Sequence, residues 1–229
     1  MQTKYILTDI EGTTTDIAFV HKVLFPFSLK FLEDYVRENE LKSEIQEILG
    51  KTKETLIQEN KCTPTKQEII QALKDWIIID RKHPALKSLQ GYIWESGYQS
   101  GEIKAHLYPD VIPAWEKWRK NLLQLGIYSS GSVKAQKLLF AHTEKGDLTP
   151  MLDHFFDTSV GAKQDVSSYL NILKKIDMLG PQVLFLSDVE KELDAAQMAG
   201  FQTLQLIRPG TVKSGQHLSV SSFDQIKLI

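Results

Sequence analysis

Short apolar runs, typical of buried strands, open the chain and recur through its second half. Between the later runs the apolar residues repeat at helical spacing, so strands and helices alternate. The predicted strands lie at residues 5–7, 127–128, 155–159, 183–188 and 201–207. Helices that cross between them are expected at 133–142, 165–176 and 190–199, and Gly126 is expected to end the helix before the second strand. This alternation predicts an α/β fold, a doubly wound five-stranded parallel sheet.

A long block of helical periodicity separates the first predicted strand from the second. It runs from about His21 to about Lys104 and has no convincing strand pattern. Within it, Thr63–Glu68 has the pattern of a helix cap and first turn. Just before it, Asp16–Val20 is β-branched and aromatic, so we expect one arm of a small hairpin there.

The position of this block predicts two domains. We expect a core formed by residues 1–18 and 107–229, with residues 19–106 inserted as an α-helical cap. An insertion that follows the first strand must leave the sheet at the carboxyl end of that strand. That edge is where Asp9 lies, and open α/β sheets bind their ligands there.

The composition narrows the class of partner. The 229 residues include 42% hydrophobic and 24% charged residues, with a formal net charge of −2. This near balance gives no support for nucleic acid or an anionic membrane as a partner. Cys62 is the single cysteine, so no intrachain disulfide or cysteine metal cluster is possible, which agrees with a reducing cytosol.

No targeting or membrane signal is evident in the pattern. Residues 1–4 lead directly into a strand of a few residues without the apolar core of a signal peptide, and no apolar run approaches about 20 residues. We therefore expect a cytoplasmic protein. In the absence of a heptad pattern or a large hydrophobic tail, we expect a monomer.

Polar side chains follow the predicted strands where each strand ends. The first strand is followed by two acids, the second by two hydroxyls, the third by an ammonium group and the fourth by an acid: Asp9, Glu11, Ser129, Ser130, Lys163 and Asp188. Because carboxyl ends of parallel strands share one edge, these groups are expected to meet. Carboxylates, hydroxyls and one cation suit a phosphate ester bound with Mg²⁺.

Each group taken alone has a simpler interpretation. The Ser129–Ser132 segment can be an ordinary loop, and Lys163 a solvated surface lysine. Asp188 can be the N-cap of the helix that follows it, and Glu192 can form surface ion pairs on that helix. The combination favours a site, because four independent strand ends supply compatible groups.

The same residues resemble the four motifs of the haloacid-dehalogenase-type phosphohydrolases, whose Rossmann-like core carries an inserted cap. The resemblance narrows to the enolase-phosphatases of methionine salvage, the acireductone synthases. It rests on Asp9–His21 with Leu24–Pro26, on Trp94–Lys104 and on Ile127–Phe140, and it covers nearly the whole chain. Most phosphatases of the superfamily carry Asp at the position of Glu11, whereas the enolase-phosphatases share this Glu.

The resemblance implies a substrate, 2,3-diketo-5-methylthiopentyl 1-phosphate, that is first enolised and then dephosphorylated to an acireductone. It also implies one Mg²⁺ per chain, held by the carboxylates of Asp9 and Asp188 and the backbone carbonyl of Glu11. Asp9 is then the nucleophile and Glu11 the acid and base. The phosphate is held by Ser129 and Ser130, with Lys163 as counter-charge, while Glu192 is expected to orient Lys163 or a metal-bound water.

The base for the enolisation step is not identified by the sequence. Glu11, Tyr98, Lys104 and His21 remain candidates. A phosphatase for another small phosphate ester and a catalytically inactive binding module remain as alternatives. A halide-cleaving hydrolase is disfavoured because such enzymes need no acid at the position of Glu11.

Overall fold

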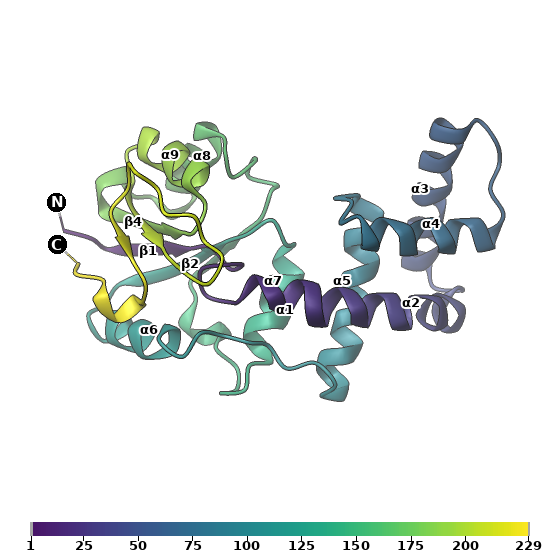
Figure 1. Cartoon of the computed structure of the whole chain (residues 1–229), viewed down its shortest axis with the longest axis horizontal. Helices are drawn as coiled ribbons and strands as arrows, with labels where there is room; N and C mark the ends of the chain where they lie inside the picture. The colour runs from purple at the N-terminus through teal and green to yellow at the C-terminus, as the bar shows by residue number, and fades with distance from the viewer. Residues whose placement is uncertain (1, 229) are drawn as a thin grey trace. The chain divides into compact units, whose positions relative to one another are not determined.

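A computed structural model describes residues 2–228 of the chain. The described chain divides into two compact units, one made of the residues up to Phe19 together with those from Ala105 onward, and the other of Val20–Lys104 (Figure 1). No helix among the described residues is long and apolar enough to cross a membrane.

The first unit is built on a parallel sheet. Within residues 2–228 the sheet has six strands in the order β3-β2-β1-β4-β5-β6, and each neighbouring pair is parallel. The strands are β1 (Tyr5–Thr8), β2 (Gln124–Tyr128), β3 (His154–Phe156), β4 (Val183–Ser187), β5 (Gln202–Leu206) and β6 (Ser219–Val220). Thr8 pairs with Ile127 on one side and with Leu186 on the other, so the central strands end at one level.

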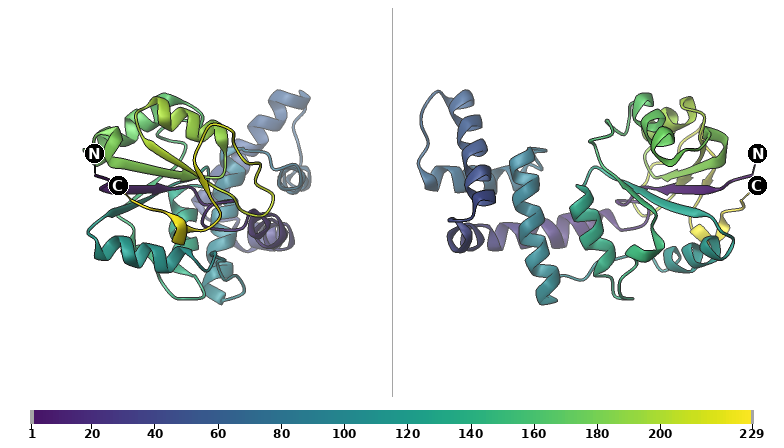
Figure 2. Two further views of the ribbon diagram at one scale, coloured as in Figure 1. Left: turned by 60° about the vertical axis from the view of Figure 1, so that its left-hand side comes forward. Right: turned by 180° about the vertical axis from the view of Figure 1, so that it is seen from behind.

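Helices cover both faces of this sheet, as a doubly wound fold requires. They are α6 (Val111–Lys120), α7 (Val133–Ala141), α8 (Val166–Ile176) and α9 (Glu190–Met198). In Figures 1 and 2, α8 and α9 lie on the face opposite α6. The fold class predicted from the alternating pattern is confirmed.

The predicted strand count of five was wrong, because β6 adds a strand at the sheet edge. This strand has only two residues, one polar and one apolar, so the sequence shows no strand periodicity there. It is held by backbone hydrogen bonds, from Gln205 N to Leu218 O at 2.8 Å and from Ile207 N to Val220 O at 2.8 Å.

The predicted hairpin arm at Asp16–Val20 was also wrong. The segment forms a short helix α1 (Ile17–Phe19) that continues into a π-helical turn, η1 (Val20–Leu24). Asp16 starts the turn, because its Oδ1 accepts a hydrogen bond from Ala18 N at 2.8 Å. A local side-chain bond of this kind outweighs the β propensity of the apolar residues.

Gly126 lies inside β2 rather than at a helix end, since α6 already ends at Lys120. A side chain at Gly126 would collide with the hydroxyl and ring of Tyr5 on the neighbouring strand. The glycine is therefore explained by a close approach between strands.

The core on the α8 and α9 face is aromatic. Tyr169 of α8 packs edge-on against Tyr128, Phe185 and Phe201, with ring centroids 5.3 to 5.6 Å apart. All four side chains are buried, so Tyr169 fixes α8 to the end of β2, to the middle of β4 and to the residue just before β5.

The second unit consists of helices, α2 (Phe25–Asn39), α3 (Ser43–Asn60), α4 (Lys66–Ile78) and α5 (Pro84–Ser100). Helix α2 packs on α4 and α5, and α3 packs on α5. Their buried faces share one apolar core, which includes Leu32, Leu73 and Leu89. The helix N-cap predicted at Thr63–Glu68 is present, because Thr65 and Glu68 form a reciprocal capping box at the start of α4.

Candidate active site

A tight turn follows β1 and carries two of the predicted acids. Asp9 N donates to Leu186 O at 2.9 Å, which extends the sheet by one residue beyond β1. The backbone N–H groups of Thr13, Thr14 and Thr15 all donate to Ile10 O, at 3.1, 2.9 and 2.9 Å. The chain thus reverses directly after the strand and holds the backbone around Glu11 in one place.

Gly12 makes this turn possible in two ways. Its φ of +73° lies in the left-handed region that side chains disfavour. In addition, the carboxylate of Asp188 fills the space that a Cβ at Gly12 would occupy. Asp188, at the end of β4, is thereby in direct contact with the turn after β1.

Lys163 lies at the centre of the acidic groups. Its Nζ is 2.5 Å from Asp9 Oδ1 and 2.7 Å from Glu192 Oε2. All three side chains are at most 10% exposed. Burial alone would lower the pKa of Lys163, but the charges of Asp9 and Glu192 outweigh it and raise that pKa. Lys163 is therefore a charged, buried lysine and not a solvated one.

Glu192 is correspondingly not a surface residue. Its Oε2 also accepts a hydrogen bond from Ser187 Oγ at 2.9 Å. The pKa of Glu192 is raised to about 7, first by burial and then by the charge of Asp9, with Lys163 acting in the opposite direction. Ser187 belongs to this hydrogen-bonded group but was not predicted from the sequence. Its only signal is that a hydroxyl residue ends the apolar run of the fourth strand.

Ser129 connects the end of β2 to the turn after β1. Its Oγ donates to Glu11 Oε2 at 3.2 Å and accepts a bond from Gly131 N at 3.1 Å. Burial and the nearby charge of Asp9 raise the pKa of Glu11, while Lys163 and Ser129 lower it by less. Ser130 follows at the next position and is exposed.

Asp188 does not cap helix α9, as the simpler interpretation required. The residue at the N-cap position is Val189, without a side-chain cap bond. Asp188 Oδ1 is buried and has no hydrogen-bond partner within residues 2–228. Burial, and next the charge of Asp9, raise the pKa of Asp188 to about 7. The edge thus holds more carboxylate charge than Lys163 offsets, which suits a bound cation.

No group of three or more His, Cys, Asp or Glu side chains that could hold a metal ion occurs in the part of the chain that the structure describes. The ligand set implied by the resemblance does not need such a group. It uses two carboxylates, those of Asp9 and Asp188, with a backbone carbonyl at Glu11. The remaining positions around a hard cation are ones that water and phosphate oxygens ordinarily fill.

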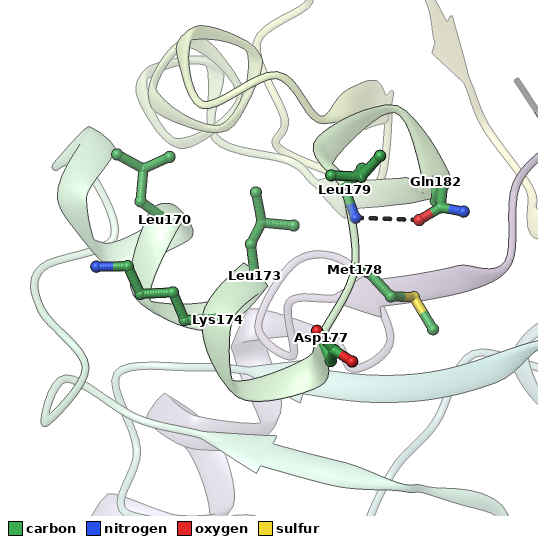
Figure 3. Close-up of a pocket in the computed structure, with 7 residues that line it drawn as sticks. All are labelled: Leu170, Leu173, Lys174, Asp177, Met178, Leu179 and Gln182. Carbon is green, nitrogen blue, oxygen red and sulfur yellow. Dashed lines mark hydrogen bonds between the residues drawn. The ribbon is translucent and has the colours of Figure 1, made fainter.

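A separate groove of about 490 Å³ lies elsewhere on the first unit. Figure 3 shows that it is lined by the end of α8 and the segment leading to β4, where Gln182 is the last residue before the strand. It therefore lies toward the amino ends of the strands, and none of the predicted site residues lines it.

Comparisons with known proteins agree with this geometry. Residues 3–200 match the family model of the haloacid dehalogenase-like hydrolases. The chain is 49% identical over 221 residues to the enolase-phosphatase E1 of Cronobacter sakazakii, covering 96% of this chain and 95% of that protein. It is 45% identical to the protein of the same name from Picosynechococcus, over 97% of each chain.

A solved structure is similar over the whole length. The crystal structure of the UTR4 protein of Saccharomyces cerevisiae has a TM-score of 0.80 and 36% identity, covering 99% of this chain and 100% of that one. The structure brings the two acids after β1, a buried lysine and the acid after β4 to one place, and the relatives match along nearly the full length of the chain. The chain therefore belongs to the enolase-phosphatase E1 family of the haloacid dehalogenase-like hydrolases.

Proposed function

We propose that this chain is an Mg²⁺-dependent enolase-phosphatase of methionine salvage. It converts 2,3-diketo-5-methylthiopentyl 1-phosphate into phosphate and the acireductone 1,2-dihydroxy-3-keto-5-methylthiopentene. The observation that carries the proposal is the buried contact of Lys163 with Asp9 and Glu192, beside a Glu11 that Ser129 holds. The name shared by the relatives supports the same assignment.

Asp9 is the proposed nucleophile. One of its carboxylate oxygens attacks phosphorus, the bond from phosphorus to the ester oxygen breaks, and an aspartyl phosphate forms. Lys163, 2.5 Å from Asp9 Oδ1, holds the carboxylate in position and offsets the charge that grows on the phosphoryl oxygens. Ser129 and Ser130 are proposed to bind the other oxygens of the phosphate.

Glu11 is the proposed acid and base. It protonates the leaving ester oxygen, and its carboxylate then takes a proton from the water that hydrolyses the aspartyl phosphate. Burial and the charge of Asp9 raise its pKa above the usual value, which favours the protonated form that the first step requires. The bond from Ser129 keeps the carboxyl oriented.

One Mg²⁺ is proposed to bind at the carboxylates of Asp9 and Asp188 and the backbone carbonyl of Glu11. The buried Asp188 Oδ1, without a hydrogen-bond partner within residues 2–228, and the raised pKa of Asp188 support this ligand set. When bound, the cation neutralises phosphoryl charge and polarises the diketone carbonyl.

We also propose that residues 1–18 and 107–229 form the catalytic core and that 19–106 form a cap. Among the candidates for the enolisation base, Tyr98 is the least suited. It is only 4% exposed, and this burial raises its pKa, which disfavours the phenolate that would act as the base. His21 and Lys104 are exposed on the helical unit. Glu11 is the candidate in the first unit. Its side chain is one methylene longer than that of Asp, so its carboxyl group can reach past the ester oxygen toward the carbon skeleton of the substrate.

The substrate assignment is tested by comparing esters. Phosphate release is measured with the diketo phosphate and with common sugar phosphates, each with Mg²⁺ and with EDTA. The proposal predicts Mg²⁺-dependent release from the diketo ester at far higher kcat/KM. Release from sugar phosphates alone would establish the generic phosphatase instead, and release from neither would establish the binding module.

A further inference from the structure

In the loop between β3 and α8, side chains bind the backbone carbonyl groups of the segment that leads to Lys163. Four consecutive backbone carbonyls each accept a hydrogen bond from a different side chain. The pairs are Asn171 Nδ2 to Val160 O at 3.0 Å, Tyr128 hydroxyl to Gly161 O at 2.9 Å, Ser168 Oγ to Ala162 O at 2.7 Å and Tyr169 hydroxyl to Lys163 O at 2.7 Å.

The donors come from rigid elements. Tyr128 ends β2, and the other three lie on α8 within one helical turn. Tyr128 and Tyr169 are fully buried, and their rings pack edge-on at 5.6 Å. Loop carbonyls are usually left to water, so four side-chain donors on four successive carbonyls fix this segment unusually well.

Gly161 brings the loop close enough for these bonds. Its φ of +131° is strained for other residues, and Ser168 Oγ fills the place that a Cβ would occupy. The loop backbone is therefore pressed against the first turn of α8. A larger residue at Gly161 would push the loop off its donors.

The position of this backbone determines where the ammonium group of Lys163 lies, and Lys163 is the one lysine among the described site residues. A lysine side chain has four rotatable bonds, so a fixed backbone reduces the number of positions open to its Nζ, which lies 2.5 Å from Asp9 and 2.7 Å from Glu192. Misplacement of a catalytic group by about 1 Å can cost about 100-fold in rate.

We propose that Tyr128, Ser168, Tyr169 and Asn171 form a carbonyl clamp that positions Lys163 for phosphoryl transfer. They are positioning residues, because they contact the loop and act through Lys163. The inference rests on the proposed function only in that Lys163 must serve a phosphoryl-transfer step.

Tyr169→Phe tests the clamp, because it deletes the donor to Lys163 O and keeps the buried ring. We expect kcat for the diketo phosphate to fall about 10-fold, a part of the loss that a full 1 Å shift can cause, with KM within about twofold. Tyr5→Phe is the matched control. It also removes one hydroxyl of a buried tyrosine, bonded to His154 Nδ1 at 3.1 Å, at the start of β1 rather than at its carboxyl end. The control is expected to keep kcat.

A double-mutant cycle with Lys163→Met separates positioning from a merely structural effect. If the clamp acts through Lys163, adding Tyr169→Phe to Lys163→Met changes the residual kcat by less than about twofold. The same 10-fold fall in both backgrounds, or an equal fall in Tyr5→Phe, would overturn the proposal. If Tyr169→Phe does not fold, Asn171→Ala, at an exposed position, serves as the second variant. The clamp is contradicted if Asn171→Ala leaves kcat unchanged and the effects of Ser168→Ala and Lys163→Met on kcat are additive.

The two proposals fail in different ways. The cycle is repeated with para-nitrophenyl phosphate, and orthovanadate binding with Mg²⁺ is measured by calorimetry. A wild-type protein that hydrolyses only para-nitrophenyl phosphate removes the enolase-phosphatase assignment while the cycle still decides the clamp. If neither ester reacts, weaker orthovanadate binding by Tyr169→Phe than by Tyr5→Phe supports the clamp, and equal binding overturns it.

Discussion

A buried ion pair beside the turn after β1 gives a quantitative test of how the first unit is held together. The Nη2 of Arg208 donates to both carboxylate oxygens of Asp110, at 3.1 and 2.8 Å. Arg208 Nε also donates to Thr13 O at 3.2 Å, and Nη1 to Ser221 O at 3.1 Å. One guanidinium therefore joins the turn after β1, the start of α6 and the carboxyl-terminal segment.

Arg208→Met removes the charge but keeps an apolar stem of similar length. Breaking a buried pair by removing one partner costs about 3–5 kcal/mol, because the other charge is left unpaired. Arg208 and Asp110 are 8% and 9% exposed, so water offers little compensation. We therefore expect the free energy of unfolding to fall by about 3–5 kcal/mol, which lowers Tm by about 6–20 °C at 2–4 °C per kcal/mol.

The assay is urea unfolding and thermal melting of the wild type, Arg208→Met and the double variant Arg208→Met with Asp110→Leu. The double variant should lose less stability than the single one, since it leaves no unpaired charge. A single variant within about 1 kcal/mol of the wild type would show that the buried pair does not stabilise the fold as expected. So would a double variant whose losses simply add.

The same pair has a defined pH dependence. Burial acts to raise the pKa of Asp110, but its bonds from Arg208 and Phe223 N outweigh this and lower it. A lowered pKa in the folded state gives stability that is present above the unfolded value of about 3.9 and is lost as pH falls through the folded value. The stability gap between wild type and Arg208→Met should therefore narrow below about pH 4.

Three further changes test the site and the sheet. Asp9→Asn should lower phosphate release by at least about 1,000-fold, because it removes the proposed nucleophile. Phosphate release is measured under single-turnover conditions, and near-normal release would contradict this role. Asp188→Asn should raise the Mg²⁺ concentration needed for half-maximal rate about 10-fold or more and reduce the Tm gain on adding Mg²⁺, and an unchanged Mg²⁺ titration would remove Asp188 from the ligand set. Gly126→Ala should destabilise the first unit by about 1–3 kcal/mol in urea unfolding, because its Cβ would meet the Tyr5 ring, and an unaffected midpoint would mean that Tyr5 moves freely.

The sheet was predictable because its central strands β1, β2 and β4 are buried almost throughout and form apolar runs between segments of helical periodicity. β6 was not, since two residues at the edge, held by bonds from Gln205 and Ile207, create no period. Asp16–Val20 was misread because its composition favours a strand, whereas one local bond from Ala18 N to Asp16 starts a helix.

The chemical groups at the carboxyl edge could be predicted because parallel strands end together and the polar residue types stand out from apolar runs. Their pairing could be predicted only in part. The resemblance implied that Glu192 orients Lys163 or a metal-bound water, but nothing in the sequence says that Lys163 also contacts Asp9 or that Ser187 holds Glu192. Those contacts depend on the path of the loop before Lys163, which is set by donors from α8, the helix that follows it, and from β2, which is distant along the chain.

The most direct test of the enolase-phosphatase assignment follows both steps in one sample. The purified chain is mixed with 2,3-diketo-5-methylthiopentyl 1-phosphate and Mg²⁺, and enol absorbance and inorganic phosphate are recorded together over time. The account predicts an enol signal that rises no later than phosphate is released, and loss of both signals with EDTA. Phosphate release without any enol absorbance, or either signal at full rate in EDTA, would contradict it.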